Sequence, residues 1–208
     1  MSPEPLQWTS WPAGGGPPSC HACGRPVTDP LTDLPDRATW TVRANRALAG
    51  CRRERRPAAL LIIDLDRFKE INDTHGHPAG DAVLRAVAGL LRRSAPAGAV
   101  IGRYSGHADE FLVLVPGADL APALSVAGRI RHGIRSLAVL ARASRDTTVT
   151  ITGRTASVGL AAHPGADPTC TWLQDLLLDA DLALRSAKRD GRDRIGVVPA
   201  VAAGSGPR

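Results

Sequence analysis

The sequence is poor in lysine, aromatic residues and cysteine, and it contains no long apolar run. Two of its 26 basic residues are lysines, and aromatic residues make up 3% of its 208 positions. No apolar stretch approaches the roughly 20 residues that span a bilayer, and the N-terminus lacks the apolar core of a signal peptide. Four cysteines do not make a disulfide framework in a chain of this size. These absences argue against a membrane protein or a disulfide-rich secreted protein, so we expect a cytoplasmic protein without a membrane partner.

Arginine supplies the positive charge, which amounts to a net +6 with a pI near 9.9. A basic chain suits nucleotides, nucleic acids or acidic partners, and the charge alone does not choose among them. The densest basic run, at 52–56, contains no aromatic residue, which is typical of a solvated helix end. A nucleic-acid partner is therefore not expected. The length fits one ordinary domain with tails.

The most informative stretch lies at 61–81. An apolar run at 58–63 predicts a buried strand, Asp64 and Asp66 stand at its end, and a polar loop follows with Asn72, Asp73, Gly80 and Asp81. A second acidic pair, at 109–110, precedes another apolar run. Ligands of α/β proteins gather at the carboxyl ends of strands, and carboxylates bind divalent metals. The pattern predicts a divalent-metal and nucleotide site.

Periodicity and turn residues predict an α/β domain. Helices are expected over 41–56, 81–93, 119–137 and 171–191, the last with a capping box at Thr171 and Gln174. Strands are expected at 58–63, 100–104, 110–115, 147–160 and 195–198. The strands at 100–104 and 110–115 form a hairpin, and the order of elements suits a sheet with this antiparallel hairpin near its centre.

The first 28 residues are rich in proline and glycine and show no period, which indicates a disordered or loosely docked leader. Cys20 and Cys23 form a C-x-x-C turn inside it. A tetrahedral zinc site needs four ligands, and this turn supplies two, or three with His21. Two readings stay open: a structural Zn²⁺ site, completed across a dimer, or a plain reduced turn.

Five segments, in order, resemble the GGDEF (diguanylate cyclase) domain family, whose motifs read approximately D-x-LTGLPNR, D-x-D-x-FK-x-IND-x-x-GH-x-x-GD, RYGGDEF, T-x-SIG and AD-x-ALY-x-AK-x-x-GRN. The matching stretches are 29–37, 64–81, 103–111, 155–159 and 180–193. The resemblance implies a nucleotidyl-cyclase or palm-like central sheet with an antiparallel hairpin, flanked by helices. The resemblance covers a GGDEF-like domain at 29–198, which leaves the proline- and glycine-rich leader at 1–28 and a flexible tail of small residues at 199–208.

A cyclase of this family joins two GTP molecules into c-di-GMP and releases pyrophosphate, with Mg²⁺ or Mn²⁺ at the phosphates. The resemblance implies that Asp64, Glu110 and the Leu65 carbonyl bind the metal and that Asp109 lies near the attacking hydroxyl. An acid that directly follows apolar strand residues is costly unless paired, which favours a role for Asp64. Asp109 could also be an ordinary hairpin residue.

The resemblance implies a nucleotide-binding set of Phe68, Lys69, Asn72, Asp81, Lys188 and Arg192. Asn72 and Asp81 would bind guanine, because an amide and a carboxylate together match its edge. Asp81 could instead, or in addition, cap a helix. Lys188 and Arg192 would lie on one face at the end of the last helix and bind the polyphosphate, or else interact with the helix dipole. The backbone at Phe68 and Lys69 would cup the terminal phosphates.

The signature motif departs from the family. Four residues, 105–108, separate Tyr104 from Asp109 where the family has two glycines, and they include one glycine. The R-x-x-D product-inhibition motif is missing, and Arg185 and Asp193 stand where tyrosine and asparagine are usual. Three hypotheses follow: a degenerate GTP-binding domain with reduced or no cyclase activity, an active cyclase that works as a homodimer, or an interaction module that uses the leader as its contact surface.

Overall fold

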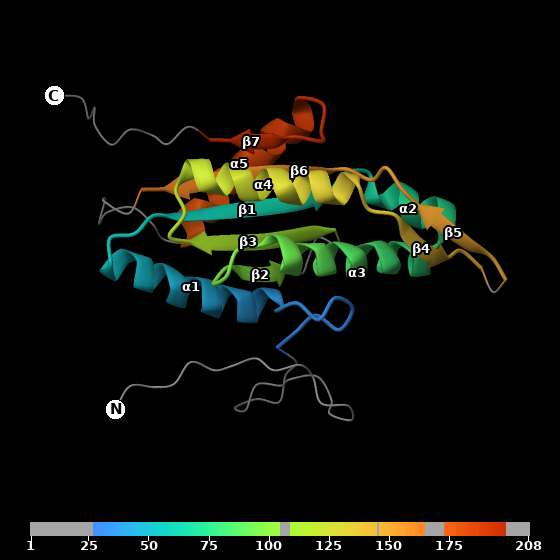
Figure 1. Cartoon of the computed structure of the whole chain (residues 1–208), viewed down its shortest axis with the longest axis horizontal. Helices are drawn as coiled ribbons and strands as arrows, with labels where there is room; N and C mark the ends of the chain where they lie inside the picture. The colour runs from blue at the N-terminus through green and yellow to red at the C-terminus, as the bar shows by residue number, and fades with distance from the viewer. Residues whose placement is uncertain (1–26, 105–108, 145, 165–172, 199–208) are drawn as a thin grey trace.

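The computed structural model describes residues 27–104, 109–144, 146–164 and 173–198. Its centre is a five-stranded sheet in the order β2-β3-β1-β6-β7 (Figure 1). These strands are Ala58–Leu65 (β1), Val100–Arg103 (β2), Glu110–Pro116 (β3), Ala156–His163 (β6) and Ile195–Val197 (β7). β7 runs parallel to β6, and the other neighbours are antiparallel. The expected α/β sheet with an antiparallel β2–β3 hairpin is confirmed.

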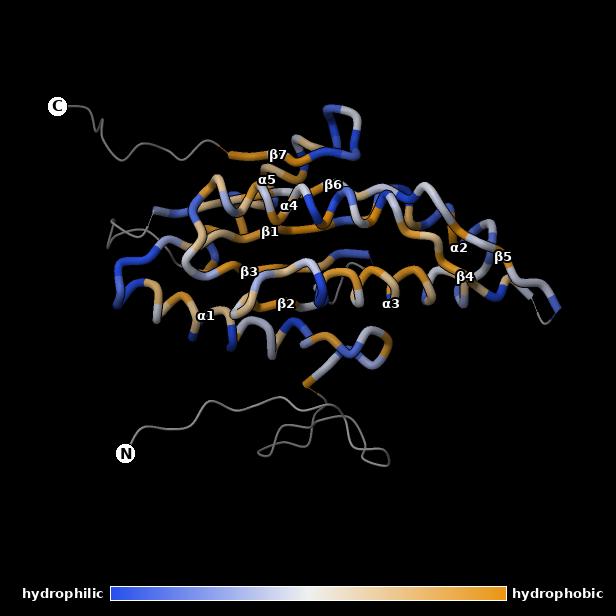
Figure 2. The backbone as a smooth tube through the Cα atoms, viewed as in Figure 1, coloured by the Kyte–Doolittle hydropathy of each residue, from blue (hydrophilic) through white to orange (hydrophobic). Residues whose placement is uncertain are grey.

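Two helical layers bury the sheet. The helices are Arg37–Arg53 (α1), Phe68–His75 (α2), His77–Ser94 (α3), Leu120–Arg135 (α4) and Leu173–Arg189 (α5). All eight residues of β1 are buried, because alternate side chains point to opposite faces. Leu61 and Ile63 belong to the core cluster with α2, α3 and α4, whereas Leu60 and Ile62 belong to the cluster with α1 and α5. Figure 2 shows the apolar strands between more polar outer surfaces.

Helix α5 lies directly on the backbone of two strands. A Cβ atom at Gly159 of β6 would stand 2.0 Å from the Ala180 carbonyl oxygen, and one at Gly196 of β7 would stand 2.0 Å from the Ala183 carbonyl oxygen. Contacts this short leave room for glycine alone. The close approach places the last turn of α5, with Lys188, beside the end of β1.

The segment after Asp66 differs from the predicted polar loop. It forms helix α2, and α3 begins at His77, four residues earlier than expected. Gly76, with a φ of 83°, separates the two helices. Asp81 therefore lies inside α3, and the suggested helix-capping role for Asp81 is wrong.

A further hairpin escaped the sequence analysis. The predicted strand region at 147–160 divides into β5 (Thr148–Ile151) and β6, and β5 pairs with β4 (Val139–Arg142) in a separate two-stranded sheet. The leader with Cys20 and Cys23, the hairpin tip at 105–108 and the Thr171 end of the capping box lie outside the described residues. Within the described part, no helix is both long and apolar enough to cross a membrane.

Candidate functional site

Acidic residues converge where β1 ends. Asp64 stands opposite Glu110 of β3 and opposite Ser157 of β6. Directly opposed residues of antiparallel strands project to the same face, here the face that α1 and α5 cover. The Leu65 amide donates to the Asp109 carbonyl oxygen at 3.3 Å, which brings the start of the second acidic pair to the same end. The structure thus brings Asp64, Asp109 and Glu110 together, as the sequence predicted.

Asp64 is a buried carboxylate in a region of negative charge. Burial raises the pKa of Asp64, and the charges of Asp109 and Asp66 raise it further. Lys188 opposes these effects, because its Nζ donates to Asp64 Oδ2 at 2.6 Å. The raised pKa means that the surroundings disfavour the ionised form, so an added cation would stabilise this carboxylate.

Asp66 serves a different purpose from Asp64. Its carboxylate accepts hydrogen bonds from Thr155 Oγ1 at 2.7 Å, from Ser157 Oγ at 2.7 Å and from the Asp193 amide at 3.0 Å. These donors satisfy both oxygens and join β1 to β6 and to the turn that follows α5. The sequence suggested no such structural role, because the donors come from distant segments.

The donor set at the end of β1 suits a hard divalent cation. The carboxylates of Asp64 and Glu110 and the carbonyl of Leu65 are all oxygen ligands, which Mg²⁺ and Mn²⁺ prefer. Within the described ranges, no group of three or more His, Cys, Asp or Glu side chains could hold a metal by itself. Two carboxylates fit Mg²⁺, which usually takes its remaining ligands from water and phosphate.

The start of α2 offers backbone donors near these acids. Arg67, with a φ of 55°, precedes Phe68, and no described side chain caps the helix. The first amides of a helix lack intrahelical acceptors and favour anions. The Phe68 side chain is buried and anchors this turn, whereas Lys69 is exposed.

Asn72 and Asp81 lie on two helices that pack together. A Cβ atom at Gly80 would stand 2.0 Å from Asn72 Oδ1, so the Asn72 amide lies against the backbone next to Asp81. Both side chains are half-buried. The structure brings together the amide and the carboxylate that the sequence assigned to guanine.

Lys188 and Arg192 do not share a helix face. Helix α5 ends at Arg189, and Arg192 lies beyond it with a φ of 63°. Lys188 contacts Asp64, whereas Arg192 lines a cavity of about 350 Å³ between three turns. Arg67 and Arg154, from the turns before α2 and β6, line the same cavity. The predicted placement of the pair on one helix face is wrong, and the two additional arginines were missed.

A charged contact anchors the β2–β3 hairpin. Arg103 Nη1 donates to Asp29 Oδ1 at 2.8 Å, and the same oxygen accepts from the Thr32 amide at 2.8 Å and from Thr32 Oγ1 at 2.6 Å. Burial acts to raise the pKa of Asp29, but the hydrogen bonds from Thr32 and Arg103 outweigh it and lower the pKa. The leading turn is thereby fixed to the strand that precedes the signature motif.

Comparisons with known proteins agree with this arrangement. Residues 27–194 match the family model described as "Diguanylate cyclase, GGDEF domain". The chain is 36% identical over 169 residues to the probable diguanylate cyclase DgcC of Escherichia coli K12. The aligned region covers 81% of this chain and 42% of DgcC. It is 41% identical over 166 residues to the diguanylate cyclase TpbB of Pseudomonas aeruginosa PAO1, and this aligned region covers 79% of this chain and 35% of TpbB. The chain therefore spans less than half the length of these relatives.

Solved structures show the same fold. The GGDEF domain of DgcB from Caulobacter crescentus, crystallised with c-di-GMP, has a TM-score of 0.72 and 30% identity over 82% of this chain and 94% of that domain. Diguanylate cyclase SiaD of Pseudomonas aeruginosa, in complex with its activator SiaC, has a TM-score of 0.69 and 35% identity over 80% of this chain and 60% of SiaD. Together with the family match over most of its length, these likenesses show that the chain belongs to the GGDEF (diguanylate cyclase) domain family.

Proposed function

We propose that this domain binds GTP with Mg²⁺ in c-di-GMP signalling and has reduced or no diguanylate cyclase activity. The observation that carries the proposal is the convergence of Asp64, Glu110 and Lys188 at one end of the sheet, next to the first amides of α2. Two carboxylates, an ammonium group and a helix N-terminus form a surface that suits a metal–triphosphate complex.

Each group has a distinct part in binding. The amides at Phe68 and Lys69 would donate hydrogen bonds to the terminal phosphates. Lys188 Nζ, which donates to Asp64 in this structure, would donate to a phosphate oxygen instead. Asn72 and Asp81 would hold guanine through its donor and acceptor edge. When bound, a divalent cation held by Asp64, Glu110 and the Leu65 carbonyl supplies charge neutralisation at the phosphates. The chain itself positions the nucleotide rather than forming a covalent bond with it.

The hairpin supports the lowered activity. Arg103 pairs with Phe111, and the Tyr104 amide donates to the Glu110 carbonyl at 3.0 Å, so the ladder is regular up to Tyr104. The sequence then has four residues before Asp109 where the family has two glycines. Glycines permit close approach to ribose and the α-phosphate, and a displacement of about 1 Å at a reacting centre can lower the rate about a hundredfold.

An active cyclase is the second candidate, and one observation favours it. Glu110 stands opposite Asp64 despite the longer sequence between Tyr104 and Asp109, which supports a metal-binding role for this pair. Such an enzyme would need two domains face to face, since each supplies one GTP.

Calorimetry and product analysis test the proposal. The wild-type protein should bind GTP in the presence of Mg²⁺, and Asp64→Asn should weaken this binding at least tenfold because a metal ligand is lost. Asp73→Asn, an exposed change of the same kind on α2, is the matched control and should bind GTP normally. A wild-type chain that does not bind GTP contradicts the proposal, and bound zinc in that chain would favour an interaction module.

Activity is tested by incubation with GTP and Mg²⁺ and by chromatography for c-di-GMP. The wild-type chain should make little or none, and a variant with two glycines in place of 105–108 should make more. Full activity of the wild-type chain would establish the active-cyclase alternative. No gain from the shortened hairpin would show that the longer tip is not the cause of a defect.

A further inference from the structure

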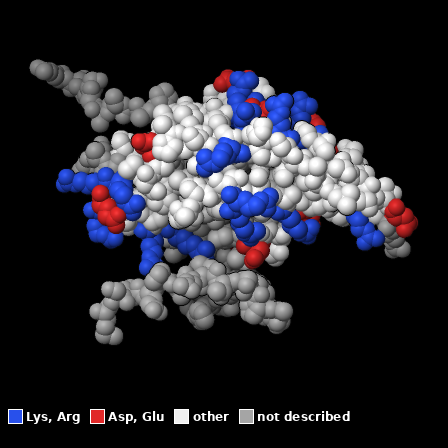
Figure 3. Space-filling model, viewed as in Figure 1, with Lys and Arg blue, Asp and Glu red and all other residues white. Residues whose placement is uncertain are grey.

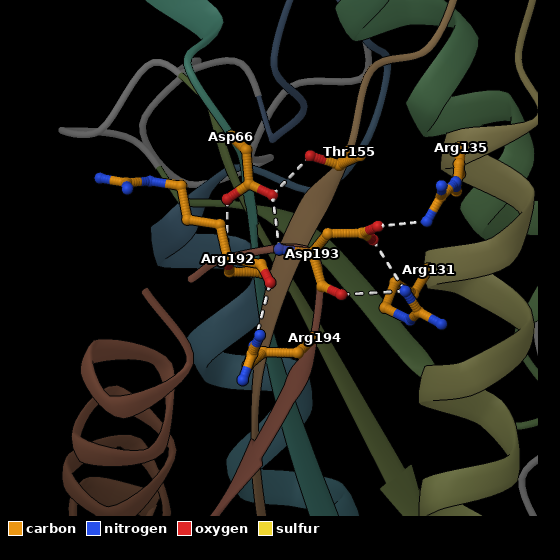
Figure 4. Close-up of polar contacts among 8 residues, drawn as sticks. Asp66, Arg131, Arg135, Thr155, Arg192, Asp193 and Arg194 are labelled. Atoms are coloured by element: carbon orange, nitrogen blue, oxygen red, sulfur yellow. Dashed lines mark hydrogen bonds and ion pairs between the residues drawn. The ribbon is translucent and has the colours of Figure 1, made fainter. Parts of the chain in front are cut away.

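Asp193 stands in the turn between α5 and β7, and its carboxylate faces two arginines of α4 (Figure 4). Its Oδ1 accepts from Arg131 Nη1 at 2.8 Å, and its Oδ2 accepts from Arg135 Nη1 at 2.6 Å. Arg131 Nη1 also donates to the Asp193 carbonyl oxygen at 2.9 Å. The Asp193 side chain is 22% exposed and that of Arg131 is 30% exposed, so water screens this contact incompletely.

The backbone of this turn needs such support. Gly191, Arg192 and Asp193 have φ values of 115°, 63° and 43°, so three successive residues lie in the left-handed region. Each non-glycine residue there costs about 1 kcal/mol or more, and the surroundings must compensate. Asp193 meets this need on two sides, because its amide donates to Asp66 while its carboxylate binds α4.

The two arginines explain why aspartate stands where the family usually has asparagine. An asparagine would offer one acceptor oxygen and would turn its NH₂ group toward the second guanidinium, where donor would face donor. A carboxylate accepts from both and forms charge-assisted hydrogen bonds, which are stronger than neutral ones. The aspartate and the arginines at 131 and 135 are thus one matched unit, which we call the α4 clamp.

We propose that the α4 clamp makes Asp193 a positioning residue that holds Arg192 toward the phosphates of the bound nucleotide. The inference rests on the proposed GTP binding. Arg192 directly precedes Asp193 and lines the arginine-bearing cavity beside Asp66, so rotation of the turn would move its guanidinium away from the cavity. The clamp residues themselves act through the turn and make no contact with the nucleotide.

The direction in which Asp193→Asn changes GTP affinity distinguishes a positioning role from a simple effect of charge. Asp193→Asn removes a negative charge near the phosphates, so long-range electrostatics alone would tighten GTP binding. Loss of the clamp would weaken it, by about tenfold, as expected for the loss of a hydrogen bond between charged groups. Asparagine tolerates a positive φ, so this variant keeps the fold. Arg131→Gln should weaken GTP binding by a similar factor.

Calorimetric titration with Mg²⁺ and either GTP or GMP makes the test. Both variants should bind GTP about tenfold more weakly and GMP within about twofold of wild type, because the clamp acts on the phosphate end. Arg129→Gln, which removes the same charge from the same helix, should leave both affinities unchanged. The double variant of residues 131 and 193 should bind GTP little worse than either single variant, since both changes break one unit.

Several outcomes would overturn the inference. Tighter GTP binding by Asp193→Asn would mean that Asp193 acts only through its charge. Equal losses of GTP and GMP affinity would mean that the substitutions destabilise the domain in general. Variants that bind GTP as wild type does would overturn the positioning role alone. A wild-type chain that binds neither GTP nor inorganic pyrophosphate would overturn the proposed function together with this inference.

Discussion

Asp64 and Asp66 stand two residues apart at the end of β1, and their carboxylates have different surroundings. Asp66 accepts hydrogen bonds from three protein donors, whereas Asp64 has Lys188 as its cation and negative charges on the other side. A satisfied carboxylate stabilises the fold, and one whose ionised form is disfavoured is available for a ligand. Asp66 therefore stabilises the fold, and the proposed binding role falls to Asp64.

Asp64→Asn should make the protein more stable while it loses GTP binding. The raised pKa shows that ionised Asp64 destabilises the native state at neutral pH, so a neutral amide should raise the free energy of unfolding, on the order of 1 kcal/mol. Urea unfolding at pH 7 with a chelator present measures this. A lower stability would mean that the contact with Lys188 outweighs the burial of the charge.

Asp29→Asn should act in the opposite direction. Because the folded-state pKa of Asp29 lies below its ordinary value of 3.8, the ionised group contributes stability above that value and loses it as the pH falls through the lowered pKa. We expect a loss of about 1–2 kcal/mol at pH 7 that shrinks below about pH 4. Asp33→Asn, on the exposed side of the same turn, should change stability by less than about 0.5 kcal/mol.

The sequence predicted the positions of single residues better than it predicted their hydrogen-bond partners. The apolar run and its terminal acids predicted which residues stand at the end of β1. The hydrogen bonds to the Asp66 carboxylate could not be predicted, because the donors Thr155, Ser157 and Asp193 come close to it only in the folded domain. The partners of Asp193 could not be predicted for the same reason, since Arg131 and Arg135 lie on another helix.

At the scale of secondary structure, the position of α5 depends on glycines in the strands beneath it. The carbonyl oxygens of Ala180 and Ala183 point at Gly159 and Gly196 and would lie 2.0 Å from an added Cβ atom in each case. A backbone cannot give way as a flexible side chain can. These contacts therefore fix the distance between α5, which carries Lys188, and the strands beneath it.

Gly159→Ala should lower both stability and GTP affinity. The methyl group forces α5 away from β6, at a cost of about 1–3 kcal/mol, and withdraws Lys188 from Asp64. Gly128→Ala, within α4, meets no atom within 4 Å and should instead stabilise the protein by about 0.5–1 kcal/mol. Thermal unfolding and GTP titration of both variants check the prediction, and similar effects of the two changes would contradict it.

Most elements followed from the sequence pattern, but helix α2 and the β4–β5 hairpin did not. Helices α4 and α5 and strands β2 and β3 lie within a few residues of their predicted ends. Helix α2 has eight residues, two of them buried, so its apolar signal was too short to distinguish from a loop. Strand β4 has four residues and pairs with the equally short β5, away from the main sheet.

At the scale of the whole molecule, positive charge favours an anionic ligand. The chain carries a net charge of +6, and several Lys and Arg groups stand out on the face shown in Figure 3. Such a field raises the association rate of a nucleotide and weakens with added salt. Net charge does not select one nucleotide, and in the proposed complex that selection rests on the groups at the end of the sheet.

The shortened-hairpin variant should show activity that depends on protein concentration. In the proposed reaction each domain supplies one GTP, so c-di-GMP formation would require two domains, and the rate per protein should rise with concentration until the dimer is saturated. Chromatographic rates over a hundredfold dilution series measure this. A rate per protein that stays constant at every dilution, in a sample that light scattering shows to be monomeric, would contradict the face-to-face arrangement.

The hydrogen bonds of Asp66 also connect the first strand to the last part of the domain. They join residues 89, 91 and 127 positions apart, and the most distant partner is the amide of Asp193. Contacts between such distant segments carry a loop-closure cost and slow folding. Because Asp193 follows α5, the hydrogen bonds that hold the acidic end of β1 are complete only after nearly the whole domain has been synthesised.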